Sequence, residues 1–254
     1  MSSRDKILER IRGALKAAPG PTEMPSAPSV WPSGNRVREE LCREFAASLA
    51  AVGGETVVCR TKEEAAERIT AFLKEIAATK IGVADRKIVT ETLAHAIGFR
   101  DGSSDFERFP VLRTNNSHAP DVASDVSPQA IAALDASLIG AEYLLTDTGS
   151  AVVASATAFD RMLCYLPPVC CVVATERMLR EHLPAAWPEI CQRIRGETAD
   201  SPEASPDADP NVPIQHLGEF LIVTGPSRTA DIEKILVMGV HGPKRLVVFV
   251  IAES

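Results

Sequence analysis

The sequence has no long apolar run, and this absence limits what the chain can be. No stretch approaches the roughly 18 to 20 apolar residues that are needed to span a bilayer. The N-terminal segment MSSRDKILERIRGAL interleaves charged residues where a signal peptide has a continuous apolar segment. We therefore expect a cytoplasmic protein without membrane insertion.

An excess of basic residues is also missing. Lys and Arg number 27 against 34 Asp and Glu, so the formal net charge is -7. Proteins that bind nucleic acids or anionic membranes in general need a spread of Lys and Arg to displace counterions. Neither class fits this composition, although a local basic site stays open.

Cofactor motifs are absent as well. The six cysteines include no C-x-x-C, and no His or Cys stands at zinc-ligand spacing from another. We expect neither an iron–sulfur cluster nor zinc in this chain and interpret the cysteines as reduced, mostly buried small hydrophobes. No G-x-G-x-x-G occurs, which argues against a conventional nicotinamide site and leaves any cofactor unknown.

The chain does have a clear division by composition. Apolar residues at helical spacing predict an amphipathic helix over 4–16 within an N-terminal arm at 1–18. A Pro-rich stretch at 19–35 predicts an extended linker, and 36–254 is expected to form a single domain. Within that domain, residues 196–213 carry prolines and acidic residues with no Lys or Arg, which predicts an exposed mobile loop.

Inside the domain, short apolar runs alternate with helical stretches. This βαβ rhythm predicts an α/β fold with a mostly parallel sheet covered by helices. The expected strands are 55–59, 80–84, 169–174, 219–223 and 246–251; the expected helices are 36–52, 62–78, 88–97, 128–139, 176–195 and a short one near 228–237.

The segment TGPSRTADIE at 224–233 follows one of these apolar runs and is the first candidate site. Gly225 permits an unusual backbone angle, and the proline after it fixes a turn. If a helix follows, Ser227 caps it, and its free N–H groups with Arg228 and the Thr229 hydroxyl would hold a phosphate or carboxylate. The alternative is that Ser227 only caps and Arg228 pairs with Asp231 or another acid.

A second polar turn, His241-Gly242-Pro243-Lys244-Arg245, leads into the last strand. In a βαβ unit the loop after the helix lies at the opposite end of the sheet from the loop before it. One ligand is then not expected to touch both turns, unless the short helix packs crosswise. The alternative role of Lys244 and Arg245 is a solvated start of the strand.

The third candidate is Asp147-Thr148-Gly149-Ser150, a polar break between two apolar runs. A hairpin with Thr148-Gly149 as its turn is the simplest structure, and the Asp either caps the turn or faces a pocket. The same four residues match the active-site pattern of aspartic proteases, but those enzymes need two carboxylates that share a proton, and one copy occurs here. A serine hydrolase is also disfavoured, because Thr229 replaces the second glycine of G-x-S-x-G.

Three stretches together resemble one known family: AEYLLTDTGSAVV, YLPPVCCVVATERML and TGPSRTADIEKILVMGVHGPKRLVVFVI. They are similar to the lactate utilization protein C family, which is built on the LUD domain. The resemblance is specific from about residue 140 to 251. It implies a fold similar to the sugar-phosphate isomerase and CoA-transferase superfamily, and a role as an accessory subunit, beside iron–sulfur subunits, in oxidising L-lactate to pyruvate.

The resemblance assigns no catalytic residue, so that role stays unknown and the chain is either a subunit or an enzyme. The alternative function is a stand-alone enzyme acting on a phosphorylated or CoA-linked small molecule. In either case the arm and the acidic loop could dock a partner protein. The matching motif residues are the candidates for binding a small anionic ligand: Asp147, Thr148, Gly149, Gly225, Ser227, Arg228, Thr229, Asp231, His241, Gly242 and Lys244.

Overall fold

The fold is known from a computed structural model, which divides the chain into two units. The units are Met1–Pro32 and Ser33–Ser254. The first contains α1 (Ser3–Ala17), where helical spacing predicted a helix. The residues that the structure describes are 3–17, 31, 34, 36–95, 111–113, 127–155, 157–194, 219–230, 236–238 and 242–252. The acidic loop 196–213 and most of the linker lie outside them.

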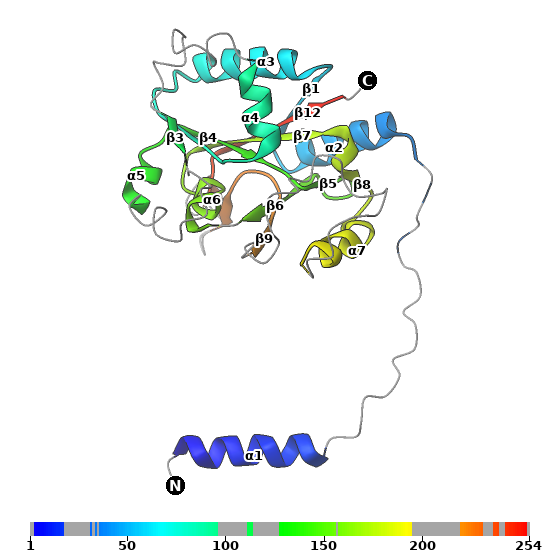
Figure 1. The fold of residues 1–254 in the computed structure, drawn as a ribbon, viewed down its shortest axis with the longest axis vertical. Helices are drawn as coiled ribbons and strands as arrows, with labels where there is room; N and C mark the ends of the chain where they lie inside the picture. The colour runs from blue at the N-terminus through cyan, green and yellow to red at the C-terminus, as the bar shows by residue number, and fades with distance from the viewer. Residues whose placement is uncertain are drawn as a thin grey trace. The chain divides into compact units, whose positions relative to one another are not determined.

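A six-stranded parallel sheet forms the centre of the second unit (Figure 1). Every pair of neighbouring strands in it is parallel. The strands, in spatial order, are β1 (Glu55–Cys59), β12 (Arg245–Ile251), β7 (Val169–Thr175), β4 (Ala136–Gly140), β2 (Ile81–Val83) and β3 (Val111–Arg113). Apart from Thr175 at the end of β7 and Arg245 at the start of β12, these two central strands are apolar, because both of their faces are buried. The predicted α/β class with a mostly parallel sheet is confirmed.

Helices cover both faces of this sheet. On one face, α3 (Lys62–Glu75) and α4 (Lys87–Ala94) pack against alternate residues of β7 and β12, including Phe249. On the other face lie α2 (Arg38–Ala51), α5 (Pro128–Ala132) and α6 (Ala158–Leu163). Each large apolar side chain buried in these layers contributes about 1.5 to 3 kcal/mol to folding.

Side-chain caps fix where several of these helices begin. The Thr61 hydroxyl accepts from the backbone N–H of Glu64 at 3.2 Å, and Thr157 with Asp160 forms a reciprocal capping box at the start of α6. Such caps satisfy backbone N–H groups that have no partner within the helix. Among the described helices, none combines the length and the apolar character that a bilayer crossing requires.

A second, four-stranded sheet has the order β8 (Leu179–Arg180), β5 (Tyr143–Leu145), β6 (Ser150–Ser155) and β9 (Glu219–Val223). Strands β5 and β6 form the predicted hairpin, but Leu145 pairs with Ser150, so its loop has four residues instead of a two-residue Thr148-Gly149 turn. One face of this sheet packs on α7 (Leu183–Ile194), and the other joins the core that contains α2. Strand β9 is one of its two edge strands.

Two predicted helices contain a strand in the structure and are much shorter than expected. The helix predicted over 128–139 ends at Ala132, and the apolar run that follows is β4, buried between β2 and β7. The helix predicted over 176–195 is a short 3-10 turn (Glu176–Met178), then β8, then α7. Periodicity alone does not distinguish a short buried strand from a buried helical segment, and pairing with neighbours decided both cases.

The helix predicted near 228–237 is wrong. The structure has a small antiparallel pair there, β10 (Arg228–Ala230) and β11 (Leu236–Met238), with Thr229 opposite Val237. Two β-branched residues at this position suit a pleated surface. Ser227 therefore caps no helix, and a helix N-terminus does not contribute to an anion site at this turn.

Candidate functional site

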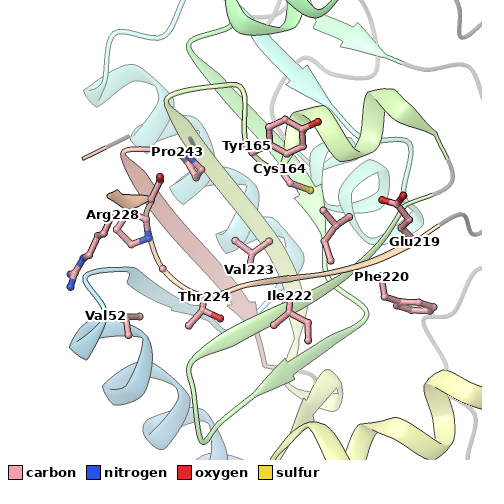
Figure 2. A pocket seen from close by; sticks show the side chains of 15 residues that line it. Val52, Cys164, Tyr165, Glu219, Phe220, Ile222, Val223, Thr224, Arg228 and Pro243 are labelled. Atoms are coloured by element: carbon pink, nitrogen blue, oxygen red, sulfur yellow. The ribbon is translucent and has the colours of Figure 1, made fainter. Parts of the chain in front are cut away.

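A pocket of about 770 Å³ runs along β9 and round the turn that follows it (Figure 2). Residues 219–228 line one side. The remaining described lining comes from Val52 at the end of α2, Cys164 and Tyr165 after α6, and Gly242 and Pro243 before β12. Four separate segments of the sequence thus meet at this pocket.

The turns at 224–228 and 242–244 lie together, contrary to the expectation from a βαβ unit. The Ser227 backbone N–H donates to the Pro243 carbonyl at 2.8 Å. A Cβ atom added to Gly242 would lie 3.0 Å from the Ser227 Cβ. The expectation failed because it assumed a helix between the turns, whereas the chain returns through the β10–β11 pair.

The C-terminal half of α2 contacts two of the polar turns, the hairpin loop at Gly149 and the turn at Gly225. Gly149 has a φ of +65°, and a Cβ atom there would lie 2.2 Å from the backbone N of Leu49, so the hairpin loop rests directly on the helix. Gly225 has a φ of +73°, and a Cβ atom there would lie 3.0 Å from the carbonyl O of Val52. Both positions need glycine for conformation and for space.

A row of hydroxyl groups joins these two turns. The Ser150 Oγ lies 2.6 Å from the Thr224 Oγ1 and donates to the Thr148 Oγ1 at 2.7 Å. The Thr148 hydroxyl donates in turn to the Asp147 Oδ1 at 3.2 Å. The antiparallel pairing of β6 with β9 places Ser150 beside Thr224 and holds the row together.

Arg228 is the basic residue among the described lining of the pocket. It is exposed, and it forms no ion pair with any side chain that the structure describes. A Cβ atom added to Gly53 would lie 2.3 Å from the Arg228 Nη2, so the guanidinium sits at the C-terminal end of α2, where helix carbonyls favour a cation. At the other end of the pocket, Glu219 pairs with Arg161 at 3.5 Å.

The two basic residues next to the pocket, Lys244 and Arg245, differ in whether their charge is already used in a contact within the protein. The Arg245 guanidinium donates to both carboxylate oxygens of Glu55 at 2.9 and 3.0 Å, and these hydrogen bonds raise the pKa of Arg245. Lys244 is exposed, and its backbone N–H donates to the Pro168 carbonyl at 2.7 Å. Arg245 is thus engaged in structure, while Arg228 and Lys244 project positive charge.

The structure places the predicted site residues in three groups. Gly225, Ser227, Arg228 and Gly242 line the pocket. The Asp147–Gly149 segment reaches it only through Ser150 and Thr224, and Lys244 follows the lining segment at Pro243. Thr229 lies in β10 with no described side chain, and Asp231 and His241 are outside the described residues.

The sequence interpretation missed Thr224, Val52 and Tyr165 as lining residues. Thr224 carried a signal, because it stands at the end of the apolar run and begins the family motif. Val52 and Tyr165 carried none, since their role depends on how α2 and α6 pack against the second sheet.

The cysteines offer no nucleophile at the pocket. Cys164 lines it, but burial raises the pKa of this thiol far above its ordinary value, and burial likewise raises the pKa of Cys170 to about 12. A protonated, buried thiol is unreactive. Within the described part of the chain, no three His, Cys, Asp or Glu residues gather as metal ligands would.

These features define an α/β protein with a parallel sheet, a second small sheet, and a pocket at the edge strand of the latter. The chain belongs to the LUD domain family, whose sequence model matches residues 42–251. This family is associated with lactate utilization, and the matched range contains all three polar turns.

Two known proteins are similar to the chain. The uncharacterized protein YkgG of Escherichia coli K12 is 30% identical over 116 residues, which is 46% of this chain and 43% of YkgG. The match thus spans less than half of that relative. The crystal structure of a DUF162 family protein from Deinococcus radiodurans is 16% identical, with a TM-score of 0.50 over 85% of this chain and 99% of that one. That likeness supports the fold.

Proposed function

We propose that this chain is an accessory subunit of an iron–sulfur complex that oxidises L-lactate to pyruvate, and that its pocket binds a small anion in that role. The observation that carries the proposal is the family match over residues 42–251, which includes every residue of the pocket. The redox cofactors belong to the partner subunits, and this chain contributes ligand binding.

The arrangement of charge supports the anionic ligand. Arg228 has no ion-pair partner among the described residues. The acidic residue in the described lining of the pocket, Glu219, is itself paired with Arg161. A guanidinium beside backbone and hydroxyl groups binds a carboxylate through charge-assisted hydrogen bonds. The positive charge of Lys244, one residue beyond the lining segment, adds to the attraction.

Complex membership is tested by anaerobic affinity purification of the tagged chain from its own cells grown on L-lactate. We expect brown, cysteine-rich subunits to co-elute and the eluate to reduce a dye when L-lactate is added. A colourless chain that elutes alone would contradict membership. The same purification from cells grown without lactate is the control for induced partners.

The anion site is tested by calorimetry of the purified chain with L-lactate. Arg228→Ala is expected to weaken binding at least tenfold, because a hydrogen-bonded charge contributes about 1.5 to 3 kcal/mol. Arg43→Ala is the matched control, since the Arg43 side chain is 71% exposed and pairs only with Glu39 among the described residues. Equal affinity of the two variants would contradict the role of Arg228.

The volume of the pocket favours a second candidate function. About 770 Å³ is much more than a three-carbon acid fills and lies in the range of sites for larger ligands. The candidate is a stand-alone enzyme that acts on a phosphorylated or CoA-linked small molecule. Thermal stabilisation by such ligands, lost in Arg228→Ala, would favour it over the subunit role.

A further inference from the structure

The two edges of the small sheet differ in how well they are protected against pairing with another chain. The β8 edge has two residues, Leu179 and Arg180, and the Arg180 guanidinium is held by two hydrogen bonds to Glu189. The β9 edge has five residues, of which only Glu219, at its start, is charged. Edge strands are usually short or carry lysine or proline, and β9 contains neither of these residues.

The backbone of β9 is paired on one side only. Each residue from Glu219 to Val223 stands opposite a residue of β6, and no strand that the structure describes lies on the other side. In an antiparallel pair, every second residue directs its N–H and C=O groups away from the partner strand. An extended polypeptide that lies along this side can pair with those groups, as in other cases where a peptide adds a strand to a sheet.

The pocket follows this strand along its whole length. All five residues of β9 line it, and at about 3.3 Å per residue they span roughly 17 Å. That length suits an extended segment of several residues better than a compact small molecule. The volume of about 770 Å³ is consistent with an occupant of this size.

Exposed apolar side chains lie on both faces of this edge. Ile222 is 49% exposed and shares a face of β9 with Phe220, which packs toward α7. Val223 points to the opposite face (Figure 2) and joins the core on which α6 packs. Tyr165, which follows α6 and lines the pocket, is 41% exposed. Because side chains of a strand alternate between faces, an added strand would cover both Ile222 and Tyr165.

The positive charge of the pocket is confined to one end. Figure 2 shows Arg228 and Glu219 at opposite ends, and Glu219 is balanced by Arg161 at 3.5 Å. Beyond the carboxyl end of β9, Arg228 and Lys244 are exposed and basic. A complementary segment therefore carries an acidic residue where it meets Arg228, because a guanidinium binds a carboxylate through charge-assisted hydrogen bonds.

We propose that the β9 edge and its pocket form a docking groove for an extended, apolar segment of a partner polypeptide with an acidic residue at one end. The inference rests on the proposed function, in which the partner is another subunit of the complex. The segment adds a fifth strand to the four-stranded sheet. In the assembled complex its carboxylate lies at Arg228, and in the isolated chain the same place is open to a small anion.

A display library of random seven-residue peptides, selected on the full chain, tests the groove. We expect the enriched peptides to be apolar with Asp or Glu at one end, and fluorescence anisotropy measures their affinity. Ile222→Lys places a charge on the edge and is expected to weaken the strongest peptide at least tenfold. Val58→Lys is the matched control, since Val58 is 51% exposed on β1, an edge strand of the other sheet. No enrichment, or equal affinity of the two variants, overturns the groove.

Strand addition makes a second prediction about the selected peptide. Only every second N–H group of the peptide faces β9. N-methylation of those residues is expected to abolish binding, whereas N-methylation of the residues between them leaves the affinity unchanged. Arg228→Ala is expected to weaken the acidic peptide about tenfold and to leave its uncharged amide counterpart unaffected. An equal effect of N-methylation at every position overturns strand addition.

Affinity purification with the same variants separates this inference from the proposed function. Iron–sulfur subunits that co-elute with wild type and Val58→Lys, but not with Ile222→Lys, support both. Co-elution with all three leaves complex membership intact and overturns docking at β9. Co-elution with none overturns membership, and the peptide affinities then decide the groove by themselves. A chain that sediments as a dimer, and as a monomer after Ile222→Lys, assigns the groove to a second copy and overturns the partner polypeptide.

Discussion

At the scale of single residues, the arginines show why charge in a sequence does not identify a site. Arg86 donates to Glu142 at 2.7 Å and to the Ala154 carbonyl at 2.8 Å. Arg180 forms two bonds to Glu189, at 2.8 and 2.7 Å, and lies over the ring of Tyr143. Arg228 has no such described partner, and only tertiary contacts reveal this difference.

The Asp135 carboxylate makes a prediction about pH at this scale. Burial alone would raise the pKa of Asp135, but the N–H groups of Thr79 and Lys80, at 2.7 and 2.9 Å, and the Thr79 hydroxyl lower it below its ordinary value. Because the pKa is lower in the folded state, the carboxylate stabilises the fold at neutral pH. That contribution is lost as the pH falls from the unfolded value of about 4 through the folded pKa.

Asp135→Asn is therefore expected to lower the free energy of unfolding at pH 7 by about 1.5 kcal/mol, with the difference shrinking toward pH 3. Urea unfolding at pH 7, 5 and 3 measures it. Glu39→Gln is the control, because the Glu39 side chain is 87% exposed in a weak surface pair. A deficit for Asp135→Asn that stays constant with pH would contradict the account.

At the scale of secondary-structure elements, single helices and strands were easier to predict from the sequence than the contacts between them. Apolar spacing identified α2, and the polar break identified the β5–β6 hairpin. Neither pattern indicated that the Gly149 loop rests on Leu49 of the helix. The β10–β11 pair was missed for a related reason, because its stability lies in pairing and not in local periodicity.

The contact between α2 and the hairpin loop predicts a large effect of Gly149→Ala. The new Cβ atom would combine a strained φ of +65° with a backbone clash at 2.2 Å. We expect the free energy of unfolding to fall by about 3 kcal/mol. Thermal unfolding measures this, with Gly13→Ala as control, since nothing lies within 4 Å of a Cβ atom there. Equal melting temperatures for the two variants would show that the loop does not rest on α2 as described.

At the scale of the whole molecule, the α/β class and the family were predictable from sequence. The alternation of apolar runs with helical stretches indicated the parallel sheet, and three motifs indicated the LUD domain. The second sheet was not predictable, because β9 joins β6 from far along the chain and no local pattern encodes that pairing. The pocket depends on this long-range pairing. The sequence therefore indicated some of the residues that line it, but not that they come together in one pocket.

The most direct test of the central claim joins the pocket to lactate utilization in the cell. A strain that lacks the chain is complemented with wild type, with Arg228→Ala or with the exposed control Arg43→Ala, after equal expression and equal melting temperatures are verified. The account predicts that wild type and Arg43→Ala restore growth on L-lactate and that Arg228→Ala does not. Full growth with Arg228→Ala would contradict it, because lactate utilization would then not depend on the cation of this pocket.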